Sequence, residues 1–337
     1  MKGNLYIRTI YLLISSLISF VYLYIFLNLP NTFFRDRDVY LIYAEDSDQL
    51  FDLYSGIALY FNEPIFLSIN VFLRNFLSSE NIIFLYLCIT ISGTLFLLFK
   101  YSKNLFMFCL GLFLLAICHY SFHAQFVVLR QTIASIILLF TLTYTKDIKK
   151  TLIISFLCSF IHSSFFLITM LIFFYHLIQR FPSYVKSVIV TIASAVLGLF
   201  ITVVGKYLGV RQATEDHIVS AVRVGGGAFL CFLMLLTYFL FFYKEDEKNK
   251  NIYDFSILGL SLFVGLYFVN PAAGRLMSTF ILPIIFLLTS RFNILNIFIM
   301  VVLSFLFLYL DSQGAINEMS LNVNFDQIFG YIGKDIF

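Results

Sequence analysis

Long apolar runs separated by short polar segments occupy most of this chain. A helix needs about 20 apolar residues to cross the ~30 Å hydrocarbon core of a bilayer. Runs of about this length, or somewhat shorter, occur at 9–29, 82–99, 105–122, 124–145, 151–178, 185–205, 228–243, 252–269, 276–290 and 294–310. The pattern predicts an all-α polytopic integral membrane helix bundle with about 10–11 transmembrane segments.

The largest departure from this pattern is the polar segment 30–81, which we expect to form a large outer loop. It carries eight acidic residues and three arginines. Its apolar stretch 65–77 is too short to cross a bilayer, so we expect a re-entrant or interfacial helix there. A second outer loop is expected at 206–227. No hydrophilic stretch is long enough for a soluble domain, so 1–337 is predicted to be a single transmembrane domain.

The run 151–178 allows two topologies. As one helix it would be ~42 Å long at 1.5 Å per residue, which is long for one crossing and short for two. His162, Ser163 and Ser164 interrupt its middle. A single crossing and two short or re-entrant pieces therefore both remain possible, and the choice decides on which side all later loops lie.

Composition agrees with a membrane protein, since 61% of residues are hydrophobic and only 12% are charged. A net charge of +3 gives no indication of a nucleic-acid partner. The five cysteines lie inside apolar runs without metal-ligand spacing, and there is no phosphate-binding glycine-lysine motif. We therefore expect no metal, no cofactor and no coupling to ATP.

Lysines and arginines are distributed differently between the two sides. With the N-terminus inside and 151–178 crossing twice, ten of the twelve lysines are cytoplasmic. Seven of the ten arginines are then outside or embedded in the membrane, namely Arg35, Arg37, Arg74, Arg130, Arg211, Arg223 and Arg275. Because guanidinium binds phosphate bidentately and keeps its charge, the outer face is predicted to bind a diphosphate or carboxylate. For Arg35 and Arg37, ion pairs with the acids of 30–81 are an equal alternative.

Arg130 is the most informative single residue because it lies within the apolar run 124–145. A charge at membrane depth costs about 2.5–3.5 kcal/mol even on insertion scales. It should therefore face an internal cavity and have a partner. We interpret it as a contact for an anionic ligand, with a structural ion pair as the alternative.

Three further positions are candidates for chemistry. His162 could act as a base near neutral pH. Glu63, directly before Pro64, is either an ordinary helix start or a carboxylate at the mouth of a cavity. Arg275 follows Gly274 at an expected helix N-terminus, where free N–H groups favour anions. His119 and His123 have the i, i+4 spacing of metal ligands but no acidic third ligand nearby, so we expect packing roles.

The order of these motifs resembles the EpsG/Wzy group of polysaccharide polymerases, which includes O-antigen polymerases. The matching residues are Glu63-Pro64, then Arg130-Gln131 with Ile133-Ala134, then His162-Ser163-Ser164, and more loosely Arg275. The resemblance spans about 60–280, and each motif is short. Ser164 departs from it, since the family usually has alanine there.

The resemblance implies a metal-independent glycosyltransferase that joins undecaprenyl-diphosphate-linked oligosaccharide repeat units. It implies a bacterial inner membrane protein whose active site faces the periplasm, with a chain-length regulator as a candidate partner. His162 or Glu63 would take the acceptor proton. Diphosphate charge would be held by Arg130 and Arg275, with Arg211, Arg223 and Arg74 as further candidates.

Two other functions stay open at this stage. A flippase or transporter of the same lipid-linked oligosaccharide would be expected to show two related halves, which the sequence lacks. A membrane acyltransferase that modifies surface polysaccharide would need a characteristic His/Arg motif in its early helices, which is not found. Sugar identity, linkage and stereochemical outcome are not encoded in any recognisable motif.

Overall fold

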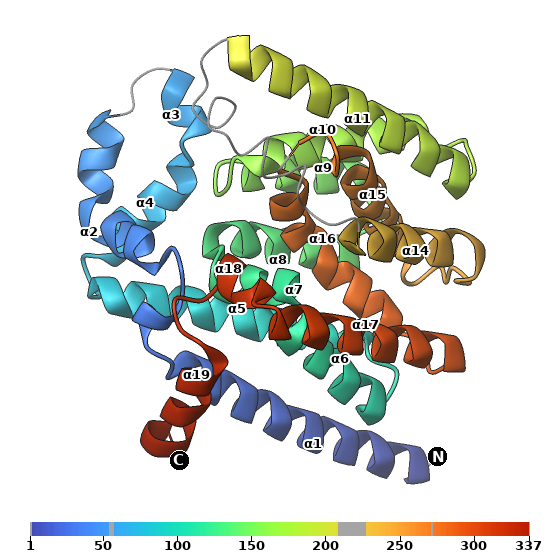
Figure 1. The fold of residues 1–337 in the computed structure, drawn as a ribbon, viewed down its shortest axis with the longest axis horizontal. Helices are drawn as coiled ribbons and strands as arrows, with labels where there is room; N and C mark the ends of the chain where they lie inside the picture. Colours follow the sequence, from blue (N-terminus) through green and yellow to red (C-terminus); the bar gives the residue numbers. More distant parts are fainter. Residues whose placement is uncertain (1, 54–56, 208–226, 271, 337) are drawn as a thin grey trace. The chain divides into compact units, whose positions relative to one another are not determined.

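The computed structural model describes residues 2–53, 57–207, 227–270 and 272–336 (Figure 1). Most of these residues are in helices, and these ranges contain no β-strand apart from an isolated bridge between Phe34 and Leu321. This confirms the predicted all-α membrane helix bundle. The predicted loop 206–227, with Arg211 and Arg223, lies almost entirely outside the described residues.

The chain forms two compact units. The first comprises 1–140, 156–165 and 285–337, and the second comprises 141–155 and 166–284. The division reflects where contacts are dense, so the single transmembrane domain stays a prediction.

The first unit contains segment 30–81 and the helices around it. Its helices are α1 (Lys2–Leu27), η1 (Asn31–Phe33), α2 (Arg37–Leu53), α3 (Ile57–Phe61), α4 (Pro64–Leu73), α5 (Ser79–Tyr101), α6 (Leu105–Ile117), α7 (His119–Phe126), most of α8 (Leu129–Tyr144), α17 (Ile294–Ser312), α18 (Ala315–Met319), α19 (Phe325–Tyr331) and η2 (Ile332–Ile336). Ser78, Asn104 and Asn293 each accept a backbone N–H at the start of the next helix. These side chains satisfy donors that the helix itself leaves unpaired, which fixes where α5, α6 and α17 begin.

The end of the chain contacts its beginning within the first unit. Arg35 N donates to Ser320 O at 3.0 Å, and Asn322 N donates to Phe33 O at 2.9 Å. His123 of α7 lies 3.3 Å from the Ser320 hydroxyl. The segment that follows α17 therefore packs against the start of segment 30–81.

The second unit contains α11 (Ser183–Tyr207), α14 (Gly227–Phe241), α15 (Lys250–Leu266), most of α9 (Ile148–Cys158) and α10 (Ser164–Leu177), and the first part of α16 (Ala272–Thr289). Small residues bring α11 and α15 together, as is common between membrane helices. A Cβ at Gly265 would lie 2.3 Å from the carbonyl oxygen of Thr191. The hydroxyls of Ser187 and Ser261 are 2.7 Å apart.

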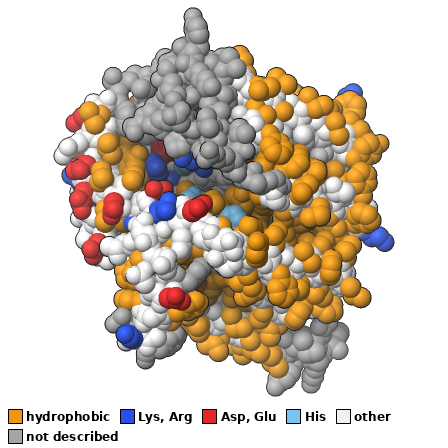
Figure 2. Space-filling view, in the orientation of Figure 1, with side chains coloured by type: hydrophobic (Ala, Val, Ile, Leu, Met, Phe, Trp, Pro, Cys, Tyr) orange, Lys and Arg blue, Asp and Glu red, His pale blue; other side chains and the backbone are white. Residues whose placement is uncertain are grey.

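The predicted apolar runs are helical, but they differ in length. Five described helices are long and apolar enough to cross a bilayer, and a sixth crossing results if α6 and α7, bent by 80°, form one span. The apolar helices α4, α8, α10 and α14 are shorter. The helix break falls after Phe126 rather than at His123, so His119 and His123 both lie within α7. Hydrophobic side chains cover much of the visible surface, and acidic ones gather over α2 (Figure 2).

The run 151–178 is two helices, α9 and α10, separated by a turn at 159–163. The hydroxyls of Ser155 and Thr169 are 2.7 Å apart across the pair. Thr151 near the start of α9 and His176 near the end of α10 line the same cavity of the second unit. The chain therefore doubles back within this run, which agrees with the topology of two short or re-entrant pieces.

Candidate functional site

Glu63, the first residue of the candidate site along the chain, has an uncommon backbone conformation. It precedes Pro64, the first residue of α4, with φ 60° and ψ 53° in the left-handed region. Such a conformation costs on the order of 1–3 kcal/mol for a residue with a side chain. The Glu63 carboxylate makes no capping bond to α4. An ordinary helix start therefore does not explain this residue.

Backbone bonds fix the first turn of α4 against the turn between α9 and α10. Ile65 N donates to Phe160 O at 3.0 Å, and Phe66 N donates to the same oxygen at 3.4 Å. These bonds satisfy helix N-terminal donors that a side chain would otherwise cap. They also bring Glu63 next to the His162-Ser163-Ser164 sequence.

The Glu63 carboxylate joins three motifs that are distant in sequence. One oxygen, Oε2, forms an ion pair with Nη1 of Arg130. The other, Oε1, accepts the backbone N–H of Ser163 at 3.2 Å and lies 3.9 Å from Nε2 of His162. Glu63 is only 8% exposed, so these contacts are shielded from solvent. The structure thus brings Glu63, Arg130 and His162 together within the first unit.

Arg130 lies in the first turn of α8, surrounded by aromatic rings. Its Cζ is 4.4 Å from the ring centroid of Tyr43, 5.5 Å from that of Phe66 and 5.6 Å from that of Tyr40. Cation–π contacts of this kind stabilise a desolvated guanidinium. Its Nε is buried and has no hydrogen-bond partner. Arg130 therefore has the acidic partner that a structural ion pair requires. It also has an unused donor, which a contact with an anionic ligand requires.

His162 is oriented by its neighbour in the turn. Its Nδ1 lies 2.7 Å from the hydroxyl of Ser164, which leaves Nε2 on the side of Glu63. Ser164 is the position where the sequence departs from the family pattern, and an alanine there could not make this bond. Burial raises the pKa of Glu63, an effect that the Arg130 charge and the Ser163 amide oppose.

Of the other predicted anion-binding arginines, only Arg74 lies in the described part of the first unit. Arg74 forms an ion pair with Asp48 at 2.6 Å and donates to Glu45 O at 2.9 Å, so it has structural partners in α2. Arg275 is exposed in the first turn of α16, in the part of that helix that belongs to the second unit. Arg211 and Arg223 lie outside the described residues, so for these three the anion-binding role stays a prediction.

The alternative given for Arg35 and Arg37, ion pairs with the acids of 30–81, is not found among the described parts of the chain. Arg35 Nε donates to Leu321 O at 3.3 Å. Arg37 is almost fully buried, donates to Phe126 O and lies 4.8 Å above the Phe34 ring. Both residues therefore hold the start of the outer segment in place.

Within the described ranges no group of His, Cys, Asp and Glu side chains could hold a metal ion. His119 and His123 are buried in α7, where His119 packs edge-on to Phe307 and His123 contacts Ser320. These contacts fit the packing roles expected from the sequence.

Sequence reasoning missed the aromatic residues around Arg130. Tyr40 and Tyr43 are three residues apart and so share a face of α2. The Tyr40 hydroxyl also accepts the backbone N–H of Arg130 at 3.3 Å. The i, i+3 tyrosine pair was the available signal, although nothing in the sequence indicated which residue it would contact.

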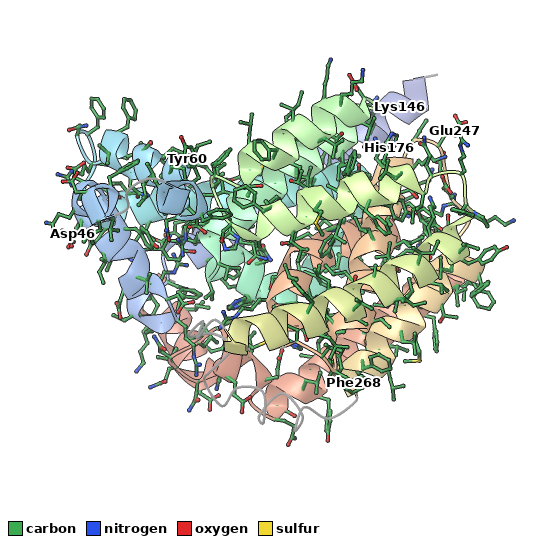
Figure 3. The ribbon with its side chains drawn as sticks, turned by 90° about the horizontal axis from the view of Figure 1, so that it is seen from above. Asp46, Tyr60, Lys146, His176, Glu247 and Phe268 are labelled. Atoms are coloured by element: carbon green, nitrogen blue, oxygen red, sulfur yellow. The ribbon has the colours of Figure 1, made fainter. Side chains whose placement is uncertain are left out.

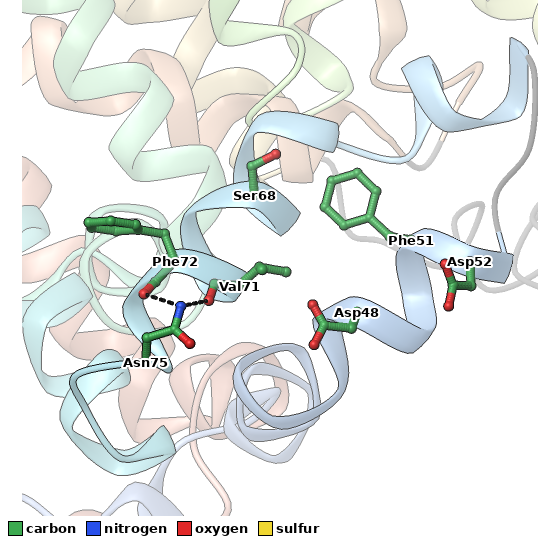
Figure 4. A pocket seen from close by; sticks show the side chains of 7 residues that line it. All are labelled: Asp48, Phe51, Asp52, Ser68, Val71, Phe72 and Asn75. Carbon is green, nitrogen blue, oxygen red and sulfur yellow. Dashed lines mark hydrogen bonds between the residues drawn. The ribbon is translucent and has the colours of Figure 1, made fainter.

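A cleft lies between α2 and the part of α4 beyond Glu63 (Figure 4). Its volume is about 510 Å³, and it is open to solvent. The lining comprises Asp48, Phe51, Asp52, Ser68, Val71, Phe72 and Asn75. Carboxylates, a hydroxyl and aromatic rings side by side are groups that can contact the hydroxyls and the apolar faces of sugars.

Comparison with known proteins identifies the family of this chain. Neither curated proteins nor solved structures give a match to this chain. The model of the EpsG family matches residues 13–317, a range that includes Glu63, Arg130, His162 and all of the helices between them. This match covers most of the chain, and it fits a membrane protein of the polysaccharide-polymerase kind. The chain belongs to the EpsG family.

Proposed function

We propose that this protein is a polysaccharide polymerase, a membrane glycosyltransferase that joins undecaprenyl-diphosphate-linked oligosaccharide repeat units. The observation that carries the proposal is the convergence of Glu63, Arg130 and His162, from three separate motifs, in one buried cluster. Family membership supports the polymerase class. We further propose that the site faces the periplasm of the bacterial inner membrane, on the side opposite the lysine-rich loops.

Arg130 would hold the charge of the donor diphosphate. One of its terminal nitrogens is engaged by Glu63, while its Nε has no partner. An oxyanion near this Nε would gain a charge-assisted hydrogen bond in a site of low polarity. The surrounding tyrosine and phenylalanine rings exclude water and so strengthen this interaction.

Glu63 would serve as the base. The acceptor sugar hydroxyl attacks the anomeric carbon of the donor, a new C–O bond forms, and the bond from that carbon to the diphosphate oxygen breaks. The hydroxyl proton passes to the Glu63 carboxylate as undecaprenyl diphosphate leaves. Glu63 loses one negative charge while the leaving group gains one, so the total charge around Arg130 is unchanged during the step.

His162 is the alternative base, but two observations favour a positioning role. Its Nδ1 is occupied by Ser164, and its Nε2 points toward Glu63 at 3.9 Å. Burial raises the pKa of Glu63, which makes the carboxylate a stronger base. His162 would then orient Glu63 and the incoming hydroxyl.

The test compares Arg130→Ala and Arg275→Ala with Arg180→Ala in a strain that lacks the chromosomal gene. Arg180 is the control because it is an exposed arginine that belongs neither to the Glu63 cluster nor to the lining of the cleft. We expect both test variants to abolish long polymer and accumulate single-repeat glycolipid, whereas Arg180→Ala keeps the wild-type ladder. Membrane abundance is measured for each variant.

Wild-type chain length in Arg130→Ala would contradict the proposal. Repeat units trapped on the cytoplasmic face would instead indicate a flippase. Normal polymer length with loss of an acyl modification would indicate an acyltransferase. The carbohydrate analysis of one deletion strain distinguishes all three outcomes.

A further inference from the structure

A second polar cavity lies in the second unit. Its volume is about 320 Å³, and it is bounded by the end of α8, the starts of α9, α11 and α15, and the end of α10. Its polar lining includes Lys146, Tyr175, His176, Lys186, Lys250 and Asp254. None of these residues belongs to the Glu63 cluster, and the following inference does not rest on the proposed polymerase function.

The floor of this cavity is a buried ion pair that is already satisfied. Lys186 is only 7% exposed, and its Nζ lies 3.3 Å from Oδ1 of Asp254. The Tyr175 hydroxyl donates to the same oxygen at 2.9 Å, and Lys186 Nζ lies 4.2 Å from the Tyr175 ring centroid. The one carboxylate that lines the cavity is therefore engaged by two partners.

The rim of the cavity carries excess positive charge. Lys146 is exposed, and among the described residues its ammonium group has no hydrogen-bonding or ionic partner. Lys250, also exposed, has a loose contact of 3.8 Å with Glu245. Figure 3 shows Lys146 and the ring of His176 close together at this end of the unit. Asn251 holds the rim by donating to Leu142 O and Thr145 O at 3.1 and 2.8 Å.

Apolar side chains form much of the remaining wall of the cavity, beside Thr151 and Gln179. Leu142, Ile172, Phe255 and Leu258 line it next to the charged rim. The helix ends that form the rim carry the lysines of 146–150 and 244–250, so the positive-inside tendency places this end at the cytoplasmic surface. A cavity with a cationic rim and apolar walls at the ends of membrane helices has the chemistry of a lipid headgroup site.

We propose that this cavity binds the phosphate headgroup of an anionic membrane lipid. Lys146 and Lys250 contact the phosphate, and the apolar walls receive the glycerol backbone and the first carbons of an acyl chain. The fixed Lys186–Asp254 pair shapes the floor without presenting a free negative charge. A soluble phosphate would use the same lysines but would gain nothing from the apolar walls.

The test measures the Tm of the full-length protein in a neutral detergent. Three probes are added separately, namely phosphatidylglycerol, phosphatidylcholine and inorganic phosphate. The double variant Lys146→Ala/Lys250→Ala is compared with Lys149→Ala/Lys248→Ala, which removes the same charge from the same loops but from residues that do not line the cavity.

We expect phosphatidylglycerol to raise the wild-type Tm by several degrees, and phosphatidylcholine and phosphate to have little effect. The shift should fall by at least half in Lys146→Ala/Lys250→Ala and stay intact in Lys149→Ala/Lys248→Ala. An equal fall in both double variants would overturn the proposal, because it would indicate diffuse attraction by the loops. A shift with inorganic phosphate as large as that with phosphatidylglycerol would also overturn it, in favour of a soluble anion.

Discussion

Each unit of this molecule buries an acid–base pair next to tyrosine rings, and the two pairs are satisfied to different extents. In the second unit Asp254 Oδ1 accepts from both Tyr175 and Lys186. In the first unit the Nε of Arg130 has no partner, and its acid Glu63 sits on strained backbone. A fully paired cluster fits a structural role, whereas left-handed backbone at the acid of the pair, together with an unused donor on its base, is found more often at functional sites. The comparison therefore supports the functional role proposed for the Glu63–Arg130 pair and favours a structural role for the Lys186–Asp254 pair.

Replacing Glu63 by glutamine should have the largest effect on activity. Glutamine keeps the size of the side chain but cannot take a proton, and general bases contribute about 10²–10⁴-fold to rate. We expect the loss of long polymer, measured from the polymer ladder, to be far larger than any loss of folded protein, measured as membrane abundance. In the wild type, activity should fall in mild acid, at a higher pH than for an ordinary carboxyl, because burial raises the pKa of Glu63.

That result would be contradicted by wild-type polymer in Glu63→Gln. Glu63→Asp is the control, because aspartate keeps the carboxylate on a shorter side chain. It should retain a measurable fraction of activity. An acid limb that persists unchanged in Glu63→Asp but disappears in His162→Gln would move the base to His162.

Replacing Lys186 by methionine should affect stability rather than chemistry. Removing one partner of a buried ion pair leaves an uncompensated charge, at a cost of up to about 3–5 kcal/mol. Asp254 keeps its bond from Tyr175 and is partly exposed, so we expect the lower end of that range. Thermal unfolding in detergent should show a clear fall in Tm, with polymer made in proportion to the folded protein that remains.

The double variant Lys186→Met/Asp254→Leu removes both charges and should recover part of the lost Tm. Lys149→Met, which changes an exposed lysine, is the control. An unchanged Tm in Lys186→Met would break the comparison, since the pair would then not be structural.

Replacing His162 by alanine should lower polymer formation by about tenfold, which corresponds to about 1.4 kcal/mol of activation free energy. A positioning residue affects how the base is held, so the acid limb of the pH profile should also move. Glutamine at this position can still hydrogen-bond and should restore part of the activity. A loss as complete as that of Glu63→Gln would show that His162 acts directly.

Ser164→Ala should have the smallest effect. It removes one hydrogen bond to His162, a contact worth about 0.5–1.5 kcal/mol, so we expect the polymer yield to fall by at most about tenfold. Densitometry of the polymer ladder can resolve this change. A loss greater than that of His162→Ala would contradict the assigned role of the serine.

Much of the fold could be predicted because helix formation follows local apolar runs. The apolar runs were found as helices, and caps such as Asn104 lie where the polar residue precedes the run. The breaks at Cys118 and after Phe126 could not be predicted, since the sequence there remains apolar and the bend depends on what packs against it. The doubled-back run 151–178 was one of two topologies that its length allowed.

The site was predictable in its members but not in its contacts. Arg130 was evident as a charge in an apolar run, and Glu63 and His162 by their motifs. Their meeting depends on contacts across 67 and 100 residues, which no local pattern encodes. For Arg74, the charge and the expected side of the membrane predicted an anion contact and gave no indication that Asp48 would be its partner.

The contact between residues 33–35 and 320–322 has a practical consequence for handling this protein. Residues 320–322 provide backbone partners to 33–35, nearly 290 positions earlier. Residues 320–322 are therefore part of the folded structure around 33–35. Deleting the chain after Ser312 should leave insertion into the membrane intact but loosen the start of α2, which carries Tyr40 and Tyr43 to Arg130. An affinity tag at the C-terminus should be separated by a flexible linker, so that purification does not itself abolish activity.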